Sequence, residues 1–461
     1  MDLTRFRTRT IGVLSGIALL AVTPLPAQDI YTAIEPKPLT LADGGRQAED
    51  EIILPPPSEG PSMRTDFGDA KNISDSKQKP SAEIRNDDSI SATPNKFHYG
   101  FRLTIRGVYD DNIFLTETNR VDDYYIAIEP GLTLGFGDIV ARQENYIRLD
   151  YAPSIFLFAD HSESNAVQHL IRLEGQHRFS RLTLTFSQDV QLLDGTNLTS
   201  TTSSGTPVLN LDAGGTTAID IYTSMLNFSY DLSGKTFLSG GLHFNVWDYK
   251  NNLISSSEFS GNLFINYNYS PKLVIGIGGT GGHNWVDSPS VDQTFEQVNV
   301  RFTYQLTGKI SLNASAGVEF RQFENGGGDH TSPVYELGAT YQPFDGTTIS
   351  LRGSSRTMNS AVFAQQDYLP SSIVFGITQR LVQRVFLGLT AGYEHSEYFS
   401  TSNTVNANRN DDYYFVEPAV DVMVTRWMTV GAYYLHREND SNAGGFSFRD
   451  NQVGVRASFT F

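Results

Sequence analysis

The sequence contains no cysteine, and this absence excludes a disulfide scaffold, a thiolate metal site and cysteine catalysis. Charged residues make up only 18% of the chain, and we find none of the amphipathic helices that a globular protein of 461 residues normally carries. Basic residues are scarce as well, since 34 Lys and Arg stand against 51 Asp and Glu, a net charge of -17. Nucleic acid rewards a basic surface, so we expect no nucleic-acid partner.

Long apolar runs are also missing. The mean hydropathy of -0.27 excludes a bundle of transmembrane helices, because each helix needs about 20 nearly uncharged residues. A transmembrane β-barrel is compatible with that value, because only alternate residues of its strands must be apolar. The counts of Gly, Phe and Tyr are high, at 40, 29 and 22 copies.

The first 27 residues have the pattern of a secretory signal peptide. Arg5, Arg7 and Arg9 form a cationic start, residues 11–22 form a short apolar run, and Leu25-Pro26-Ala27 offers a cleavage site. The apolar run is too short to span a membrane core of about 30 Å as a helix. We therefore favour cleavage over a membrane anchor.

Residues 28–96 differ in composition from the rest of the chain. They contain repeated prolines, including Pro55-Pro56-Pro57, among polar residues with almost no aromatics. Such a segment buries too little apolar surface to fold alone. We interpret it as a disordered Pro-rich periplasmic extension, with a plug inside a barrel as the alternative, and we assign residues 97–461 to the folded domain.

From Phe97 onward, apolar and polar residues alternate in segments of about ten. In the first segment, Phe97, Tyr99 and Phe101 share one face, while His98 and Arg102 belong to the other. Short turns such as 233–235, 270–272 and 307–309 alternate with long polar loops near 110–123, 193–215 and 396–412. Alternating short and long connections are typical of an outer-membrane barrel, with short periplasmic turns and long surface loops.

The segment count predicts an all-β fold, an antiparallel up-and-down transmembrane β-barrel of about 18 strands (16–18). The predicted strands begin near residues 97, 124, 145, 167, 181, 219, 236, 258, 273, 294, 310, 334, 348, 369, 385, 413, 428 and 451. The stretch from 355 to 370 is ambiguous in this count. A barrel of that size leaves an aqueous channel rather than a packed interior.

The C-terminus has the alternation expected of an assembly signal. Apolar residues occupy every second position back from the terminal aromatic, at Val453, Val455, Phe459 and Phe461. This pattern resembles the C-terminal β-signal that outer-membrane barrels present to the barrel-assembly machinery.

A second resemblance concerns residues 97–461. Tyr109-Asp110-Asp111-Asn112-Ile113-Phe114, followed by a loop and then Glu129-Pro130-Gly131-Leu132, resembles the opening hairpin of the putative beta-barrel porin 2 family. That resemblance implies a bacterial outer-membrane barrel, and some members are encoded beside exopolysaccharide genes. The family carries no established catalytic residues to transfer to this chain.

One motif occurs twice, as residues 119–125 and 408–414, and each copy contains an Asp-Asp-Tyr-Tyr sequence. Two carboxylate-rich rim sites for a divalent cation or for lipopolysaccharide counterions are one interpretation. Repeated strand-entry sequence, with Tyr in the interfacial aromatic belt, is the interpretation that we favour. We accordingly expect no metal site and no cofactor.

A rim hydrolase is an alternative of a different class. The candidate groups are His161-Ser162-Glu163 and His395-Ser396-Glu397, but adjacent residues of an extended chain point in opposite directions. A base, a nucleophile and an oxyanion donor must lie within hydrogen-bond reach for catalysis. We therefore predict that the chain is not an enzyme and has no catalytic residue.

Strand parity places many charged residues on the face opposite the lipid. The pore-lining candidates are Arg102, Arg106, Arg148, Asp150, Arg172, Glu174, Arg178, Arg301, Glu319 and Arg456. Six of these arginines lie on strands near the predicted closure and form a basic wall, which favours charge sorting of solutes. A salt-bridged ladder, with Asp150 beside Arg148 and Arg172, is an equally supported interpretation.

These observations predict a porin-like outer-membrane barrel for diffusion of small hydrophilic solutes through a charged lumen. The alternative is a non-conducting structural or exopolysaccharide-secretion-associated barrel. The third long loop, 193–215, is the candidate constriction, with a mobile surface loop as its alternative. Expected partners are outer-membrane lipids, lipopolysaccharide and the assembly machinery, and a homo-oligomer is left open. We expect both termini in the periplasm and the long loops at the cell surface.

Overall fold

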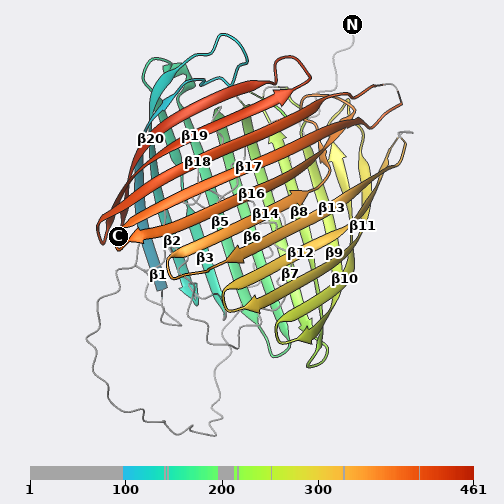
Figure 1. Ribbon diagram of the computed structural model, residues 1–461. Coiled ribbons are helices and arrows are strands. Elements are labelled where there is room, and N and C mark those ends of the chain that lie inside the picture. Colours follow the sequence, from blue (N-terminus) through green and yellow to red (C-terminus); the bar gives the residue numbers. More distant parts are fainter. Residues whose placement is uncertain are drawn as a thin grey trace, which may run out of the picture. The chain divides into compact units, whose positions relative to one another are not determined.

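The computed structural model describes residues 97–461, apart from residues 140, 141, 143, 144, 196–211, 215, 216, 251, 325–327 and 404. The predicted signal peptide (1–27) and Pro-rich extension (28–96) lie outside the described residues. The described part forms one antiparallel sheet that closes on itself into a barrel (Figure 1).

The sheet is built from twenty segments that follow one another around the barrel. In chain order they are β1 (Phe97–Asp110), β2 (Asp123–Gly137), β3 (Tyr146–Tyr151), β4 (Ser154–Phe158), β5 (Ala166–Arg178), β6 (Leu182–Gly195), β7 (Thr217–Asp231), β8 (Thr236–Tyr249), β9 (Ser256–Ser270), β10 (Leu273–Val286), β11 (Gln293–Thr307), β12 (Ile310–Phe323), β13 (His330–Tyr341), β14 (Thr347–Ser355), β15 (Met358–Asn359), β16 (Gln366–Val382), β17 (Val385–Ser400), β18 (Asn410–Thr425), β19 (Met428–Ser441) and β20 (Phe448–Thr460). A 3-10 helix, η1 (Ser162–Ser164), lies between β4 and β5.

Two pairs of segments each form one barrel strand. β3 and β4 both pair with β2 on one side and β5 on the other, and Pro153 between them has no N–H to donate to the ladder. β15 pairs with β16 beyond the end of β14. Counting each pair once reduces twenty segments to 18 strands, so the predicted fold and strand number are confirmed.

The barrel is closed by pairing of its first and last strands. β1 and β20 are antiparallel, with Leu103 opposite Phe459 and Tyr109 opposite Val453. Closure leaves the sheet without a free edge, which is the condition for a β-structure to lie in lipid with its backbone groups paired. Val453, Val455, Phe459 and Phe461, the predicted assembly signal, belong to this closing strand or directly follow it.

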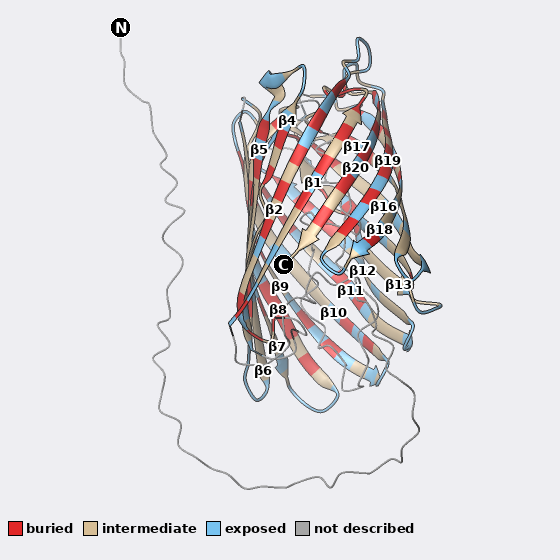
Figure 2. Cartoon of the chain, turned by 90° about the vertical axis from the view of Figure 1, so that its left-hand side faces the viewer, coloured by how far each residue is buried: buried red, intermediate tan, exposed pale blue. Residues whose placement is uncertain are grey.

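Burial alternates along the strands, as Figure 2 shows by colour. On β1, Phe97, Tyr99 and Ile105 are exposed on the outer face, while Thr104 and Arg106 are buried on the inner face. The same alternation on the other strands gives an apolar exterior and a polar interior, the arrangement of a membrane-spanning barrel. The described residues include no helix with the length and hydrophobicity of a transmembrane span.

The connections at the two ends of the barrel differ. At one end, called here the turn end, the strands are joined by 138–145, 179–181, 232–235, 271–272, 308–309, 342–346, 383–384 and 426–427. At the other, called the loop end, the connections are 111–122, 159–165, 196–216, 250–255, 287–292, 324–329, 356–365, 401–409 and 442–447. The predicted alternation of turns and loops is present, and the ambiguous stretch 355–370 contains a loop and two segments that pair with each other.

Candidate functional site

The inner face near the closure carries arginines that are paired with carboxylates. We call the inner faces of β1, β2, β18, β19 and β20 the seam wall. Arg106 Nη2 lies 2.5 Å from Glu129 Oε1. Arg456 donates from Nε and Nη2 to the two oxygens of Asp421, at 2.9 and 2.6 Å. Because each guanidinium has its own carboxylate, these two positive charges are compensated within the wall.

Pairing continues on the neighbouring strands β3 and β5. Arg148 Nε lies 2.7 Å from Asp150 Oδ2. Arg172 Nε lies 3.3 Å from Glu174 Oε2 and 3.5 Å from Asp189 Oδ1. This part of the inner surface is therefore a ladder of alternating charges rather than a basic strip.

Two arginines of the predicted basic wall are placed differently. The Arg102 side chain lies over Gly131 of β2, where a Cβ atom would collide with it. Arg178 is exposed at the turn end of β5.

Arg301 differs from the arginines of the seam wall. It lies on the inner faces of β8–β11, called here the far wall, which Figure 1 shows across the barrel from the β1–β20 closure. Nε and Nη2 of Arg301 donate to Asn266 Oδ1 at 2.9 and 2.8 Å, and Nη2 also bonds Ser239 Oγ. Its guanidinium lies 4.1 Å from the centroid of the Phe264 ring.

No carboxylate in the described part of the chain forms an ion pair with Arg301, and its exposed fraction is 6%. A buried cation with only neutral partners keeps its positive potential. Arg106, Arg148, Arg172 and Arg456 each contact a carboxylate, whereas Arg301 contacts none of the described carboxylates. The positive charge of Arg301 is therefore left uncompensated.

Residues 356–365, which we call the inward loop, extend from β14 across the inner surface at the loop end. Arg356 Nη2 lies 2.5 Å from Glu258 Oε1 of β9, and Asn284 of β10 bonds Asn359. The backbone N–H of Ile254 donates to Ala361 O at 2.8 Å. Since β9 is five strands from β14 around the barrel, the loop narrows the interior on the far-wall side.

A fully buried polar cluster lies beside the inward loop. Arg321 Nε bonds Glu319 Oε1 at 2.9 Å, and Arg321 Nη1 bonds Gln293 Oε1 at 2.7 Å. Gln293 Nε2 then donates to Asp367 Oδ1 at 3.0 Å. Arg321 and Glu319 are 1% and 0% exposed, so this section of the interior is packed by side chains.

Asp212 joins the inward loop to other loops. Its carboxylate accepts bonds from Ala361 N at 2.5 Å, from Ser360 Oγ at 2.9 Å and from Tyr398 OH at 3.0 Å. Arg409 Nη1 donates to Asp212 O at 3.1 Å. Burial raises the pKa of Asp212 above its ordinary value, against the lowering effect of these bonds and of Arg409. We call the Asp212–Arg409 contact and its partners the loop latch.

Arg409 is held in place by groups from further loops. Its Nη2 lies 2.5 Å from Asp411 Oδ2. The guanidinium also lies 3.6 Å from the centroid of the Phe446 ring, between β19 and β20. The latch therefore connects the loops that precede β7, β16, β18 and β20.

The predicted constriction, residues 193–215, is only partly described. Residues 196–211 lie outside the described residues, whereas Asp212 contacts the inward loop. The sequence prediction did not identify the inward loop, Arg321, Asp367 or the loop latch. A signal was present, because the loop contains Met358, Ala361, Val362 and Phe363 where an exposed loop is normally polar.

The repeated Asp-Asp-Tyr-Tyr motif has different contacts in its two copies. Asp123 accepts from His161 N at 2.9 Å and from Asp160 N at 3.2 Å. Asp411 is bonded to Arg409, and Asp412 Oδ1 lies 2.9 Å from His395 Nδ1. These carboxylates thus hold loop residues in place where each motif enters a strand. This role agrees with the interpretation of the motif as repeated strand-entry sequence.

The two candidate hydrolase groups do not form catalytic arrangements in the described structure. His161 Nδ1 lies 3.1 Å from Asp123 Oδ2, and Ser162 belongs to the adjacent helix η1. His395 is on the outer face of β17 while Ser396 is buried on the inner face. Adjacent residues on opposite faces of a strand cannot act as nucleophile and base on one substrate.

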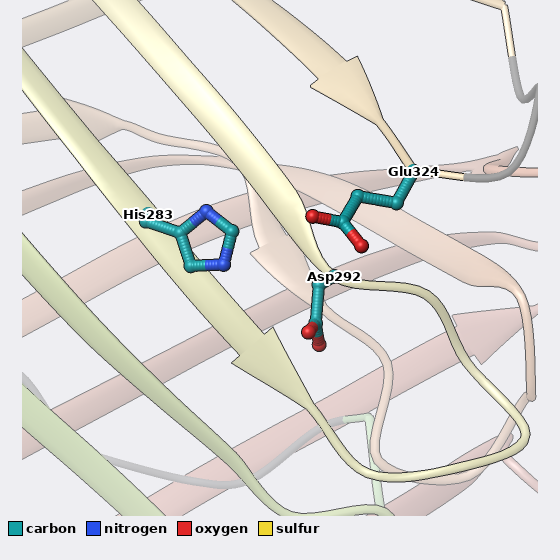
Figure 3. Close-up of side chains that lie close together, drawn as sticks. All are labelled: His283, Asp292 and Glu324. Carbon is teal, nitrogen blue, oxygen red and sulfur yellow. The ribbon is translucent and has the colours of Figure 1, made fainter.

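Two groups of side chains have the composition of a cation site. His283, Asp292 and Glu324 lie near the loop ends of β10–β12, with one ligand atom of each within 4.8 Å of the others (Figure 3). All three are at least partly open to solvent, so water can satisfy them. The second group, Asp110, Asp111 and Asp450, is mostly buried at the β1–β20 closure.

In the described part of the chain, these features define a closed β-barrel with an apolar exterior, buried charged side chains on its inner face and an inward loop. Residues 299–461 match the family described as Putative beta-barrel porin 2. This match covers the C-terminal part of the barrel, from β11 to β20, and agrees with the resemblance noted in the opening hairpin.

Among curated proteins, none matches the chain. Solved structures with a similar fold include the outer membrane protein OpdK of Pseudomonas aeruginosa, with 13% identity and a TM-score of 0.40 over 79% of this chain and 98% of that one. OccAB3 of Acinetobacter baumannii has 13% identity and a TM-score of 0.40 over 79% and 99%. OmpT of Vibrio cholerae has 14% identity and a TM-score of 0.34 over 81% and 100%.

Proposed function

We propose that the chain is a bacterial outer-membrane channel through which small hydrophilic solutes diffuse. The observation that carries this proposal is the closed barrel of 18 strands with charged side chains on its inner face. Barrels of 16 to 18 strands are wide enough to leave an aqueous passage. The long loops would then lie at the cell surface and both ends of the barrel segment at the periplasmic side.

The charge distribution supports a preference for anions. The seam wall compensates Arg106 and Arg456 with Glu129 and Asp421, whereas Arg301 has neutral partners. An uncompensated cation in a low-dielectric wall attracts anions more strongly than the same charge in water does. We therefore assign the selectivity of the channel to the far wall rather than to the predicted basic wall.

A non-conducting barrel is the second candidate, and one observation favours it. Arg321, Glu319 and Asp367 are almost completely covered beside the inward loop, which is unusual for groups that line an open passage. In this second function the barrel has a structural role or is associated with exopolysaccharide secretion, and the loop latch keeps its interior closed to ions.

Single-channel recording separates the two functions. The full-length chain, refolded and inserted into a planar bilayer in KCl, should give discrete conductance steps. Folding is checked independently by heat-modifiable migration on a gel. Correctly folded barrel that inserts without any conductance step would reject the channel and support the non-conducting function.

A further inference from the structure

The Tyr109–Phe114 motif connects the first strand to the last at the loop end. Asp111 N donates to Asn451 O at 3.1 Å, and Asn451 N donates to Asp111 Oδ1 at 2.7 Å. Asn112 Nδ2 donates to Arg449 O at 2.9 Å. The motif that resembles a family signature thus fastens the closure of the barrel.

Three carboxylates converge at this closure. Asp110 and Asp450 are both 0% exposed, and one oxygen of each lies within 4.8 Å of an oxygen of Asp111. Gln452 Nε2 donates to Asp110 Oδ2 at 2.9 Å and to Asp450 Oδ2 at 3.2 Å, so one amide holds two of the carboxylates in place. The group is therefore preorganised and not a chance meeting of mobile side chains.

The charges of this group do not balance. Arg437 Nε lies 2.5 Å from Asp450 Oδ2 and contributes one positive charge, against three carboxylates. Asp450 Oδ1 is fully covered and receives no hydrogen bond from any described residue. Two buried carboxylates in close contact cannot both stay ionised unless a cation or a proton lies between them.

We propose that Asp110, Asp111 and Asp450 bind a hard divalent cation such as Ca²⁺. Carboxylate oxygens are the ligands that Ca²⁺ prefers, and its two charges would neutralise the excess that Arg437 leaves. Asp111 is half-buried at the loop end and gives the ion a route from solvent. The ion would join β1 to β20 and so stabilise the closure, independently of whether the barrel conducts.

The experiment is a Ca²⁺ titration of the refolded full-length barrel in detergent after treatment with EDTA. Ca²⁺ should raise Tm with a Kd on the order of 10⁻⁴ to 10⁻³ M, the range of extracellular Ca²⁺ sites. Asp111→Asn keeps the size of the side chain and should weaken the response roughly tenfold or more. Asp292→Asn, in the partly exposed His283 group, is the matched control and should leave the Ca²⁺ response unchanged.

Two results would overturn the proposal. One is a wild-type barrel whose Tm is insensitive to Ca²⁺ and EDTA. The close contact of Asp110 and Asp450 would then be explained by a proton shared between the two carboxylates. The other is an equal response of Asp111→Asn and wild type. If Asp111→Asn fails to fold, the wild-type chain is tested with Tb³⁺, whose luminescence is sensitised by nearby tyrosines. We expect Ca²⁺ to displace bound Tb³⁺ and reduce this luminescence. Luminescence that does not respond to Ca²⁺ would contradict the site.

Discussion

The seam wall and the far wall of the barrel treat buried arginine in opposite ways. On the seam wall, Arg106 and Arg456 each contact a carboxylate. On the far wall, Arg301 is equally covered but bonds an amide, a hydroxyl and an aromatic face. The number of arginines on a wall therefore does not set its electrostatic character, because ion pairing with carboxylates cancels the positive potential of each arginine.

The two walls also relate to different properties: the ion pairs of the seam wall to stability, and Arg301 of the far wall to the proposed selectivity. Removing one partner of a buried arginine–carboxylate pair lowers the free energy of unfolding, because the remaining charge is buried without compensation. A buried arginine with neutral partners has no ion pair to lose, and we propose that its positive potential acts on passing solutes. Four predictions follow in order of decreasing size: two for the walls, one for the loop latch and one for an exposed ion pair.

Removing a carboxylate from the seam wall should have the largest effect. Glu129→Ala leaves Arg106 buried and without its ion-pair partner, and we expect a loss of roughly 3 kcal/mol in the free energy of unfolding. Urea unfolding of barrels folded into lipid vesicles measures this loss. An unchanged unfolding midpoint would show that the seam wall does not depend on pairing.

A carboxylate introduced beside Arg301 should make the far wall resemble the seam wall, where arginines are paired. Ser239→Asp places a carboxylate at the position that now bonds Arg301 through a hydroxyl. We expect the anion preference of the channel to fall on the order of two- to tenfold, because the far wall then resembles the seam wall. The anion-to-cation permeability ratio in bilayers measures it, and a ratio equal to that of wild type would contradict the role of Arg301.

Acid should favour the closed arrangement of the loop latch. The pKa of Asp212 is raised by burial in the latched structure, so the latched state binds a proton more readily than a released state with an ordinary pKa does. The latch is therefore most stable at low pH and loses stability as pH rises through the raised pKa.

Mean conductance should consequently decrease as pH falls below the raised pKa of Asp212, because the protonated carboxyl favours the latched state, in which the inward loop is held against the inner surface. Asp212→Asn has no titrating group at this position and should lose most of that pH dependence. An identical pH profile of the variant and wild type would exclude Asp212 as the titrating group.

An exposed ion pair should have the smallest effect. Lys250 Nζ lies 2.6 Å from Asp248 Oδ2 and 3.0 Å from Asp220 Oδ2, and these contacts raise its pKa. Because the Lys250 side chain is 44% exposed, Lys250→Gln should change the free energy of unfolding by less than about 0.5 kcal/mol. A loss as large as that of Glu129→Ala would show that burial is not what distinguishes the seam wall.

Much of the fold could be predicted from the sequence because its pattern is local. Alternation around Phe97–Ile105 and the turn at Ser270-Pro271-Lys272 depend on neighbouring residues, and strand number follows from counting such segments. Element identity therefore required no knowledge of which strands meet.

The candidate site depended on contacts that the sequence does not contain. Arg106 meets Glu129, 23 positions away, and Asp212 meets Arg409, 197 positions away. Parity identified Arg106 and Arg301 alike as inward-facing, but only the register of neighbouring strands decides which of them meets a carboxylate. The inward loop was missed because its polar and apolar residues follow no period of two.

The assignment of anion selectivity to Arg301 can be tested in one measurement. The reversal potential of the wild-type channel under a KCl gradient is compared with that of Arg301→Gln. We expect wild type to conduct with a preference for chloride, and we expect the substitution to move the reversal potential toward zero while the barrel stays folded. A wild-type channel without anion preference, or a variant with the same reversal potential, would contradict it.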